Sequence, residues 1–238
     1  MRGKIAHRYD SGQGMVEYGL ILVGVVIIVI GALAATGSSV GQVYCTVLSG
    51  LGAEGCGDCS YAFNDISEFS KWEGKDLDNV VSVENNKACF TGDGSHPRTF
   101  LNPCAKKFGG SDYMINVNDV TVDRSTGSRA VGFDVQFRSE DENNGYQFTY
   151  NTKGDFVRFW KVVEGKRILL KSQSVPKAWG EQENDFQIQV EGDTFTAYRD
   201  GAPLIQVADR TFTEGSAGIR NKPSAKTCIG DMTINTIN

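Results

Sequence analysis

The sequence has very little histidine, with only His7 and His96 among its 238 residues. His7 lies in a short basic segment at the N-terminus, and His96 precedes a proline in the run GDGSHPR. A histidine-based nucleophile relay or a multi-histidine metal site needs several suitable side chains within one domain. The scarcity of histidine therefore argues against both kinds of site.

Clustered positive charge is also missing. The chain carries 24 Lys and Arg against 29 Asp and Glu, which gives a formal net charge of -5 at pH 7. Binding to a phosphate backbone needs grouped Lys and Arg side chains, so we expect no nucleic-acid partner. The sequence also lacks an Asn-x-Ser/Thr sequon, which excludes that route to glycan attachment.

Charge of either sign is absent between Glu17 and Glu54. Within this stretch lies the apolar run Val16 to Ala35, which as a helix would span roughly 30 Å, the thickness of a hydrocarbon core. The mean hydropathy of the chain, -0.28, is that of a soluble protein, so the run is a local feature. A secretory signal peptide, with ALAATG as its cleavage site, and a plain membrane anchor are two interpretations.

Glu17 favours a third interpretation. A carboxylate at the edge of an apolar helix is costly unless it has a cationic partner. If a peptidase cuts after Gly12, the new chain begins at Gln13 and its α-amino group lies one helical turn from Glu17. In a bundle of identical helices, each amine could instead meet the carboxylate of a neighbour.

The basic leader ending in Gly12 and the sequence that follows it, QGMVEYGLILVGVVIIVIGAL, closely resemble type IV pilins of the Flp/Tad class. The resemblance extends from Ser11 to about Gly52, with cut site, Glu17-Tyr18 pair and apolar stretch in matching order. Flp pilins are usually little more than this helix, whereas here a long segment follows.

The resemblance implies how the N-terminal part is processed and assembled. A prepilin peptidase would remove the leader, residues 1–12, and Glu17 and Tyr18 would become the fifth and sixth mature residues. The helix, residues 13–52, would wait in the cytoplasmic membrane. The pilus assembly machinery would then pack it into an extracellular filament, a homopolymer held together by these helices.

Six cysteines in a chain with an export-type N-terminus indicate an oxidising compartment and up to three disulfides. A Cys/Gly-rich connector, residues 53–60, contains Cys56-Gly-Asp-Cys59 but lacks the strand-helix context of a thioredoxin-like site. No second paired motif is present for zinc. The sequence leaves the pairing open among the disulfide candidates Cys45, Cys56, Cys59, Cys89, Cys104 and Cys228.

From Tyr61 onward, short runs alternate apolar with polar residues and are separated by turn formers such as EGD and RDGA. About ten such strands without a long helical stretch predict a two-sheet antiparallel sandwich. With the N-terminal apolar helix, the expected fold class is α+β, a long helix followed by a jelly-roll domain over residues 61–238. The side chains expected in its core are Phe133, Phe137, Phe148, Phe159 and Phe186.

The run NDFQIQVEGDTFTAYRDGAPLIQVADRTFTEGSAGIRN resembles the concanavalin A-like, laminin G-like jelly roll. The opening YAFNDISEFSKWEG and the closing CIGDMTI match the first and last strands of such domains, which lie side by side. The resemblance implies a fold and not a function, because the fold hosts lectins, hydrolases and spacers. It also implies a structural calcium site at Asp65 and Asp231, for which turn-capping acids are the alternative.

Catalysis is not expected. Glucanases of this fold carry Glu-x-Asp-x-Glu on one strand, so that the carboxylates share a face, and no strand here has that pattern. Glu140, Asp141 and Glu142 lie in the polar loop SEDENNG, where alternate carboxylates would point apart. Apart from the calcium, no cofactor is expected.

Sugar binding is the stronger functional alternative to a plain spacer, because aromatic faces stack on sugar rings. Trp179, in PKAWGEQ, is the aromatic residue expected to be exposed and is the candidate glycan contact. The other candidates are Trp160, Tyr146, Tyr150 and Tyr198. The main hypothesis is a pilin that displays the sandwich, for adhesion or glycan binding; the alternative is a membrane-anchored, lectin-like surface protein that does not polymerise.

The pilin hypothesis predicts that Glu17→Ala leaves the subunit folded in the membrane but abolishes filament growth, because the carboxylate that sets the register is lost. Electron microscopy of sheared surface material would detect the loss, and mass spectrometry of the native chain should find Gln13 at its N-terminus. Normal filaments from the variant would contradict the pairing role of Glu17. A chain that still begins at Met1 would favour the anchored alternative.

Overall fold

The computed structural model describes residues 59–74, 80–92, 99–102, 112–123, 132–222 and 226–237. The chain divides into two units, Met1–Cys56 and Gly57–Asn238. The predicted leader, the pilin helix with Glu17 and Tyr18, and most of the connector lie outside the described residues. Across the described ranges, no helix is both long and apolar enough to cross a membrane.

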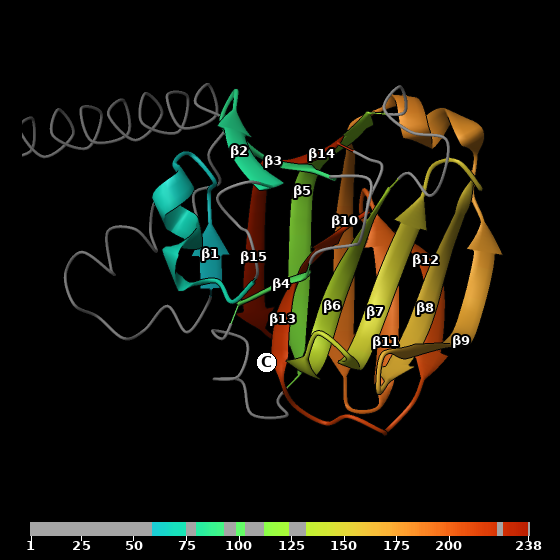
Figure 1. The fold of residues 1–238 in the computed structure, drawn as a ribbon. Coiled ribbons are helices and arrows are strands. Elements are labelled where there is room, and N and C mark those ends of the chain that lie inside the picture. The colour runs from blue at the N-terminus through green and yellow to red at the C-terminus, as the bar shows by residue number, and fades with distance from the viewer. Residues whose placement is uncertain are drawn as a thin grey trace, which may run out of the picture. The chain divides into compact units, whose positions relative to one another are not determined.

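The expected α+β fold class is wrong, because the described part of the chain is an all-β sandwich (Figure 1). Its helices are two short 3-10 helices, η1 (Ile66–Lys71) and η3 (Lys177–Glu181). The physical reason is the period of the sequence: apolar residues recur at every second position with turn residues between the runs, which suits pleated strands and not a helix.

The larger sheet has the strand order β12-β11-β10-β5-β14-β3-β2, and β15 pairs with both β5 and β1. All of these pairs are antiparallel. The strands of this nine-stranded sheet are β1 (Cys59–Tyr61), β2 (Val81–Glu84), β3 (Lys87–Thr91), β5 (Tyr113–Asp123), β10 (Asn184–Glu191), β11 (Thr194–Arg199), β12 (Ala202–Ala208), β14 (Lys226–Ile229) and β15 (Asp231–Thr236).

The smaller sheet has the order β4-β13-β6-β7-β8-β9 and is also antiparallel. Four of its strands follow one another along the chain as a meander, and it lies in front of the larger sheet in Figure 1. The strands of this six-stranded sheet are β4 (Thr99–Asn102), β6 (Gly132–Asp141), β7 (Asn144–Asn151), β8 (Phe156–Val163), β9 (Lys166–Ser174) and β13 (Ser216–Asn221).

The first and last described strands lie side by side, as the sequence predicted. Cys59 to Tyr61 pair with Ile234 to Met232, so β1 and β15 are direct neighbours. The strands at the two ends of the domain are therefore neighbours in one sheet, which is the arrangement that the opening and closing motifs indicated.

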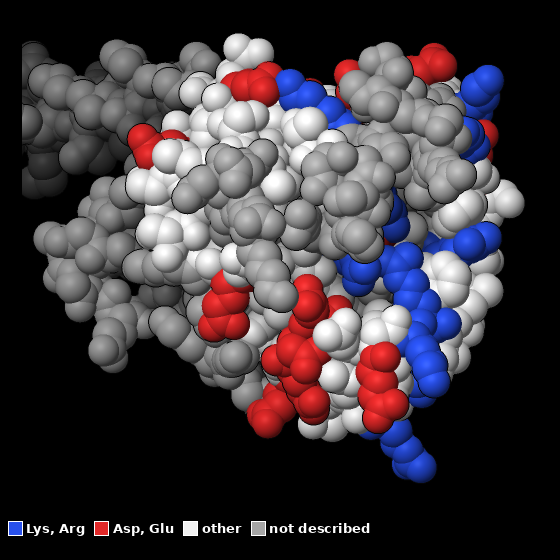
Figure 2. All heavy atoms as spheres, in the orientation of Figure 1, with Lys and Arg blue, Asp and Glu red and all other residues white. Residues whose placement is uncertain are grey.

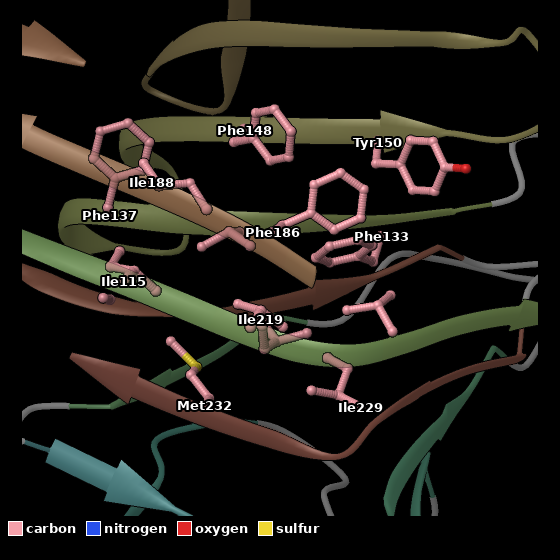
Figure 3. Close-up of a cluster of buried hydrophobic side chains, with 14 of the residues drawn as sticks. Ile115, Phe133, Phe137, Phe148, Tyr150, Phe186, Ile188, Ile219, Ile229 and Met232 are labelled. Atoms are coloured by element: carbon pink, nitrogen blue, oxygen red, sulfur yellow. The ribbon is translucent and has the colours of Figure 1, made fainter. Parts of the chain in front are cut away.

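A layer of aromatic and aliphatic side chains fills the space between the sheets (Figure 3). The five phenylalanines predicted for the core are all fully buried, which confirms that prediction. Phe186 of β10 contacts Phe133, Phe148 and Tyr150 of the facing sheet at ring-centroid distances of 5.5, 5.8 and 5.0 Å. Aromatic pairs at such distances stabilise the core beyond the burial of their area.

Disulfides are present, as the sequence predicted. Cys89 of β3 is bonded to Cys228 of β14, and the two residues are direct partners in the sheet. Cys59 is also disulfide-bonded. Cys45, Cys56 and Cys104 lie outside the described residues.

A hydrogen-bonded cluster around Asp209, the residue after β12, ties the two sheets together. The carboxylate accepts bonds of 2.7 Å from the hydroxyl of Tyr146 on β7 and from Nζ of Lys161 on β8. The backbone N–H of Thr211 donates to the same carboxylate at 2.9 Å. Burial opposes ionisation of Asp209, but the bonds from Lys161, Thr211 and Tyr146 outweigh it and hold the pKa of the carboxyl well below its usual range.

The phenol of Tyr146 responds in the opposite direction. Burial, together with its hydrogen bond to the Asp209 carboxylate, raises the pKa of Tyr146 to about 12. The hydroxyl therefore stays protonated and keeps donating its bond throughout the physiological range.

We expect Asp209→Asn to lower the free energy of unfolding by about 1–3 kcal/mol at pH 7, because charge-assisted hydrogen bonds are lost. The folded-state pKa of Asp209 lies below the unfolded value of about 3.9, so its contribution is complete above that value and is lost as the pH falls further. Urea denaturation from pH 7 to pH 3 should show the difference between wild type and variant shrinking. Asp200→Asn serves as an exposed control, and a difference independent of pH would contradict the assignment.

Candidate functional site

The outer face of the six-stranded sheet carries polar side chains in two cross-strand rows. Because Phe133, Val135, Phe148 and Phe159 are buried between the sheets, the residues that alternate with them point the other way. In one row, Arg220, Asp134, Thr149 and Arg158 are successive partners across β13, β6, β7 and β8; in the other, Gln136, Gln147 and Trp160 are partners across β6, β7 and β8. We call these seven residues the polar face.

Four residues of the polar face are buried, which is unusual for the outer side of a sheet. Asp134, Gln136 and Gln147 are 0% exposed, and Thr149 is 3% exposed. An outward-facing polar side chain would ordinarily be in water. These four are instead closed off from bulk solvent, so their polar atoms need partners.

Several of those atoms have none. Both amide atoms of Gln147, the hydroxyl of Thr149 and the indole Nε1 of Trp160 are buried without a hydrogen-bond partner in the described part of the chain. The same holds for Oε1 of Gln136, whose Nε2 donates to the backbone oxygen of Glu142 at 3.4 Å. Most buried polar groups in native proteins are paired. A group of neighbouring exceptions therefore indicates a place that a polar ligand or water occupies.

Asp134 is the charged centre of this face. Arg167 donates to its Oδ2 at 3.0 Å, and Nζ of Lys222 lies 2.6 Å from each carboxylate oxygen. Arg167 is on β9, so its side chain reaches Asp134 on β6 past β7 and β8. Strands lie about 4.8 Å apart, and such a reach requires the sheet to curve towards this face.

The cations around Asp134 outnumber it. Burial lowers the pKa of Lys222, Asp134 opposes that shift, and the nearby Arg167 adds to it. Burial also lowers the pKa of Arg220, with Arg167 again contributing in the same direction. Like charges held close together in a partly desolvated site disfavour each other's charged forms. This part of the face therefore carries more positive than negative charge.

Trp160 is the aromatic side chain of the polar face. It is half-buried, lies opposite Gln147 in the sheet, and has the guanidinium groups of Arg158 and Arg167 at 5.4 and 5.9 Å from its ring centre. These distances are within the range of cation–π attraction, which holds the indole ring beside the cations. Trp160 was one of the aromatic candidates from the sequence.

The structure does not bring the other aromatic candidates to this face. Tyr146 and Tyr150 are 0% and 1% exposed in the core, so they offer no ring to a ligand. Trp179 is half-buried in η3 and packs against the core, with the guanidinium of Arg199 at 4.2 Å from its ring. Trp179 is therefore half-buried, as Trp160 is, and its role as a glycan contact stays a prediction. Tyr198 is half-buried on the other sheet, where its hydroxyl donates to Gln189.

The two predicted calcium ligands have other partners. Asp65 caps η1 by accepting a bond of 2.7 Å from the backbone N–H of Ser67, which holds the pKa of its carboxyl below its usual range. Asp231 accepts a bond of 2.7 Å from Nδ2 of Asn118. Across the described ranges, no group of three or more His, Cys, Asp or Glu side chains is arranged to hold a metal ion. The capping bond of Asp65 matches the turn-capping alternative, whereas Asp231 contacts Asn118 of the neighbouring strand, and the calcium site stays a prediction.

The acidic run at the β6–β7 turn behaves as the sequence indicated. Asp141 accepts a bond of 2.6 Å from the backbone N–H of Asn143, and Glu140, Asp141 and Glu142 are exposed. These carboxylates stabilise a solvated turn and do not converge on a common point.

Sequence reasoning missed Asp134, Gln136 and Gln147. A signal was available, since polar residues alternate with phenylalanine and valine in GFDVQF and GYQFTY. Such alternation predicts that these residues face away from the core. It does not show that the outer side is closed off from solvent.

Comparison with known proteins supports the fold. No known family model matches the chain. A levanase of Bacillus subtilis (strain 168) is 31% identical over 111 residues, which is 46% of this chain but only 16% of the levanase. The chain therefore spans a small part of that relative.

Among solved structures, the carbohydrate-binding module CBM66 from Bacillus subtilis is 22% identical with a TM-score of 0.60, covering 70% of this chain and 96% of the module. A Bacillus subtilis protein of unknown function with a galectin-like fold is 11% identical with a TM-score of 0.56, and the match covers 75% of this chain and 94% of that protein. The exoplasmic domain of VIP36, bound to calcium and mannose, is 12% identical with a TM-score of 0.53, covering 70% and 83%. The domain thus has the galectin-like jelly-roll fold. The comparisons do not support the pilin resemblance of residues 11–52.

We expect Asp134→Asn to destabilise the domain by about 3–5 kcal/mol, because Lys222 then remains as a buried cation without its counter-charge. Adding Lys222→Met should recover part of the loss, which a double-mutant cycle from urea denaturation would measure. Glu183→Gln breaks the exposed ion pair with Lys87 and should cost at most about 1 kcal/mol. An equally small loss for Asp134→Asn would contradict its role.

Proposed function

We propose that the β-sandwich binds a carbohydrate at the polar face of the six-stranded sheet. The observation that carries this proposal is the group of buried side chains whose polar atoms lack partners, with Gln147 at its centre. A sugar hydroxyl both donates and accepts hydrogen bonds, as the amide of Gln147 does. A buried polar atom left unpaired costs about 1–3 kcal/mol, and ligand hydroxyls would remove that cost.

Trp160 gives the same face an apolar surface. It lies opposite Gln147, is half-buried, and is held in place by the neighbouring arginines. A sugar ring has apolar C–H groups on its faces and hydroxyls at its rim. An aromatic ring beside hydrogen-bonding amides matches that distribution, because small-ligand sites combine apolar walls with a few placed polar groups.

The similar proteins support a carbohydrate ligand by analogy. The levanase is named for levan, CBM66 is a carbohydrate-binding module, and the VIP36 structure contains mannose. A fold alone does not establish a function. The names of these similar proteins support a carbohydrate ligand only because the polar face has the chemistry of a sugar site.

Binding without catalysis fits this face better than glycoside hydrolysis. Hydrolysis needs a pair of carboxyl groups that flank the scissile bond. Among the described residues of the polar face, Asp134 is the only carboxylate, and Arg167 and Lys222 already neutralise it. The domain would therefore act as a recognition module.

The N-terminal sequence bears on where this module is displayed. An apolar run preceded by a basic leader supports a protein held at the cytoplasmic membrane and presented outside the cell. A membrane-anchored lectin needs only that run. A filament subunit is the second candidate, supported by the sequence of residues 11–52, and it additionally requires the cut between Gly12 and Gln13.

The proposal predicts that Gln147→Leu weakens glycan binding about 5- to 100-fold without destabilising the fold, because it removes unpaired polar atoms and keeps the side-chain volume. Affinity gel electrophoresis of the purified full chain against levan, mannan, galactan and polygalacturonate would measure both proteins. Gln187→Leu, on the outer face of the other sheet, is the matched control. Retained binding in Gln147→Leu, or an equal loss in Gln187→Leu, would contradict a site on the polar face.

A further inference from the structure

The polar face concentrates positive charge in a chain that is acidic overall. Arg167, Arg220 and Lys222 surround Asp134, whereas the chain as a whole has a formal net charge of -5. Figure 2 shows Lys and Arg side chains gathered over the β8–β9 side of this face, with Asp and Glu towards its lower end. The excess of cations is therefore a local feature and not a consequence of composition.

Arg220 is the cation of this group that forms no direct ion pair with Asp134, although Asp134 and Glu142 both lie near enough to favour its charged form. It lies opposite Asp134 in the β13–β6 register, but Asp134 is bonded to Arg167 and Lys222 instead. The buried Nε of Arg220 has no hydrogen-bond partner, and its guanidinium forms no ion pair within the described residues. Beside it lie the unpaired atoms of Gln136 and Thr149, which are the proposed sugar contacts.

A half-buried guanidinium with an unpaired donor indicates the chemical group that it binds. Its planar fork of N–H donors matches a carboxylate, which it can grip through two parallel hydrogen bonds. Burial and the nearby Arg167 lower the pKa of the Arg220 guanidinium, and the carboxylates of Asp134 and Glu142 offset that shift only in part. A bound anion would relieve both effects, because it supplies the missing negative charge where the dielectric is low.

We propose that the sugar bound at the polar face is acidic and that Arg220 pairs with its carboxylate, an inference that rests on the proposed carbohydrate binding. The ligand class is a polysaccharide containing uronic acid or another carboxylated sugar. Gln136, Gln147 and Thr149 contact its hydroxyls, Trp160 contacts its ring, and Lys222 contributes to the positive field.

Polygalacturonate and its methyl ester provide a matched test, since they share a backbone and differ only in the carboxylate charge. Isothermal titration of the full chain with each polymer should show binding at least 10-fold tighter to the acid form. Raising the salt concentration from 50 to 500 mM should weaken that preference, because charge pairing is screened. Tight binding of levan, galactan or the ester, without a preference for the acid, would overturn the acidic ligand and leave carbohydrate binding intact. Failure to bind any of these polymers would overturn both proposals.

Variants of Arg220 test the residue itself. Arg220→Gln should reduce affinity for the acid form about 10- to 100-fold, as expected for a charge-assisted contact, and leave the response to the ester unchanged. Arg220→Lys keeps the positive charge but loses the planar fork of donors, so its affinity for the acid form should lie between those of wild type and Arg220→Gln. This variant serves as the test if Arg220→Gln folds poorly. Arg210→Gln, an exposed arginine after β12, is the control. Wild-type affinity in both Arg220 variants would overturn the assignment.

Discussion

The packing of phenylalanine side chains between the two sheets is the constraint on which the rest of the structure depends. With Phe133, Phe148 and Phe159 held inside, every alternate residue of β6, β7 and β8 must lie on the outer face. The two cross-strand rows of the polar face are a direct result. A shift of one residue in any of these strands would exchange core and ligand face, so the core that stabilises the domain also aligns the candidate site.

Charge on the polar face is organised around a single carboxylate. Asp134 is bonded to Arg167 from β9 and to Lys222 from the end of β13, so it joins the two sides of a curved sheet. A buried pair of this kind gains little net stability, since desolvation offsets the attraction. Its value here is positional, because it holds the cations and the unpaired amides in one place. A site that is rigid before binding loses less entropy when a ligand arrives.

The two units of the chain suggest two separate roles, ligand binding by the sandwich and display by the N-terminal sequence. The sandwich carries the proposed binding face, and its first and last described strands are paired and β3 is joined to β14 by the Cys89–Cys228 disulfide. In the proposed function, the N-terminal sequence would display the domain, either as an anchor or as a filament helix. Repeated display on one surface or filament would raise the avidity of a weak sugar contact without any change in the site.

Much of the domain could be predicted from the sequence alone. Alternation of apolar and polar residues predicted the sandwich and the buried phenylalanines, because these depend on local period and turn chemistry, whereas the pairing of the first and last strands was implied by the resemblance to concanavalin A-like domains. The assignment of the chain as α+β failed, since the described part contains only two short 3-10 helices. Trp179 is half-buried, with Arg199 against its ring, and local pattern did not predict this contact because Arg199 lies on another strand.

Only the tertiary structure decided which polar residues form a site. The sequence determined that Asp134, Gln136 and Gln147 face away from the core, but period alone does not distinguish an exposed position from a buried one. Arg167, Arg220 and Lys222 come from β9 and from β13 and its end, far from Asp134 in sequence, and they meet because the strand order β13-β6-β7-β8-β9 and the curvature of the sheet bring them together. Local pattern determines the side on which a residue lies, and long-range strand order determines its neighbours there.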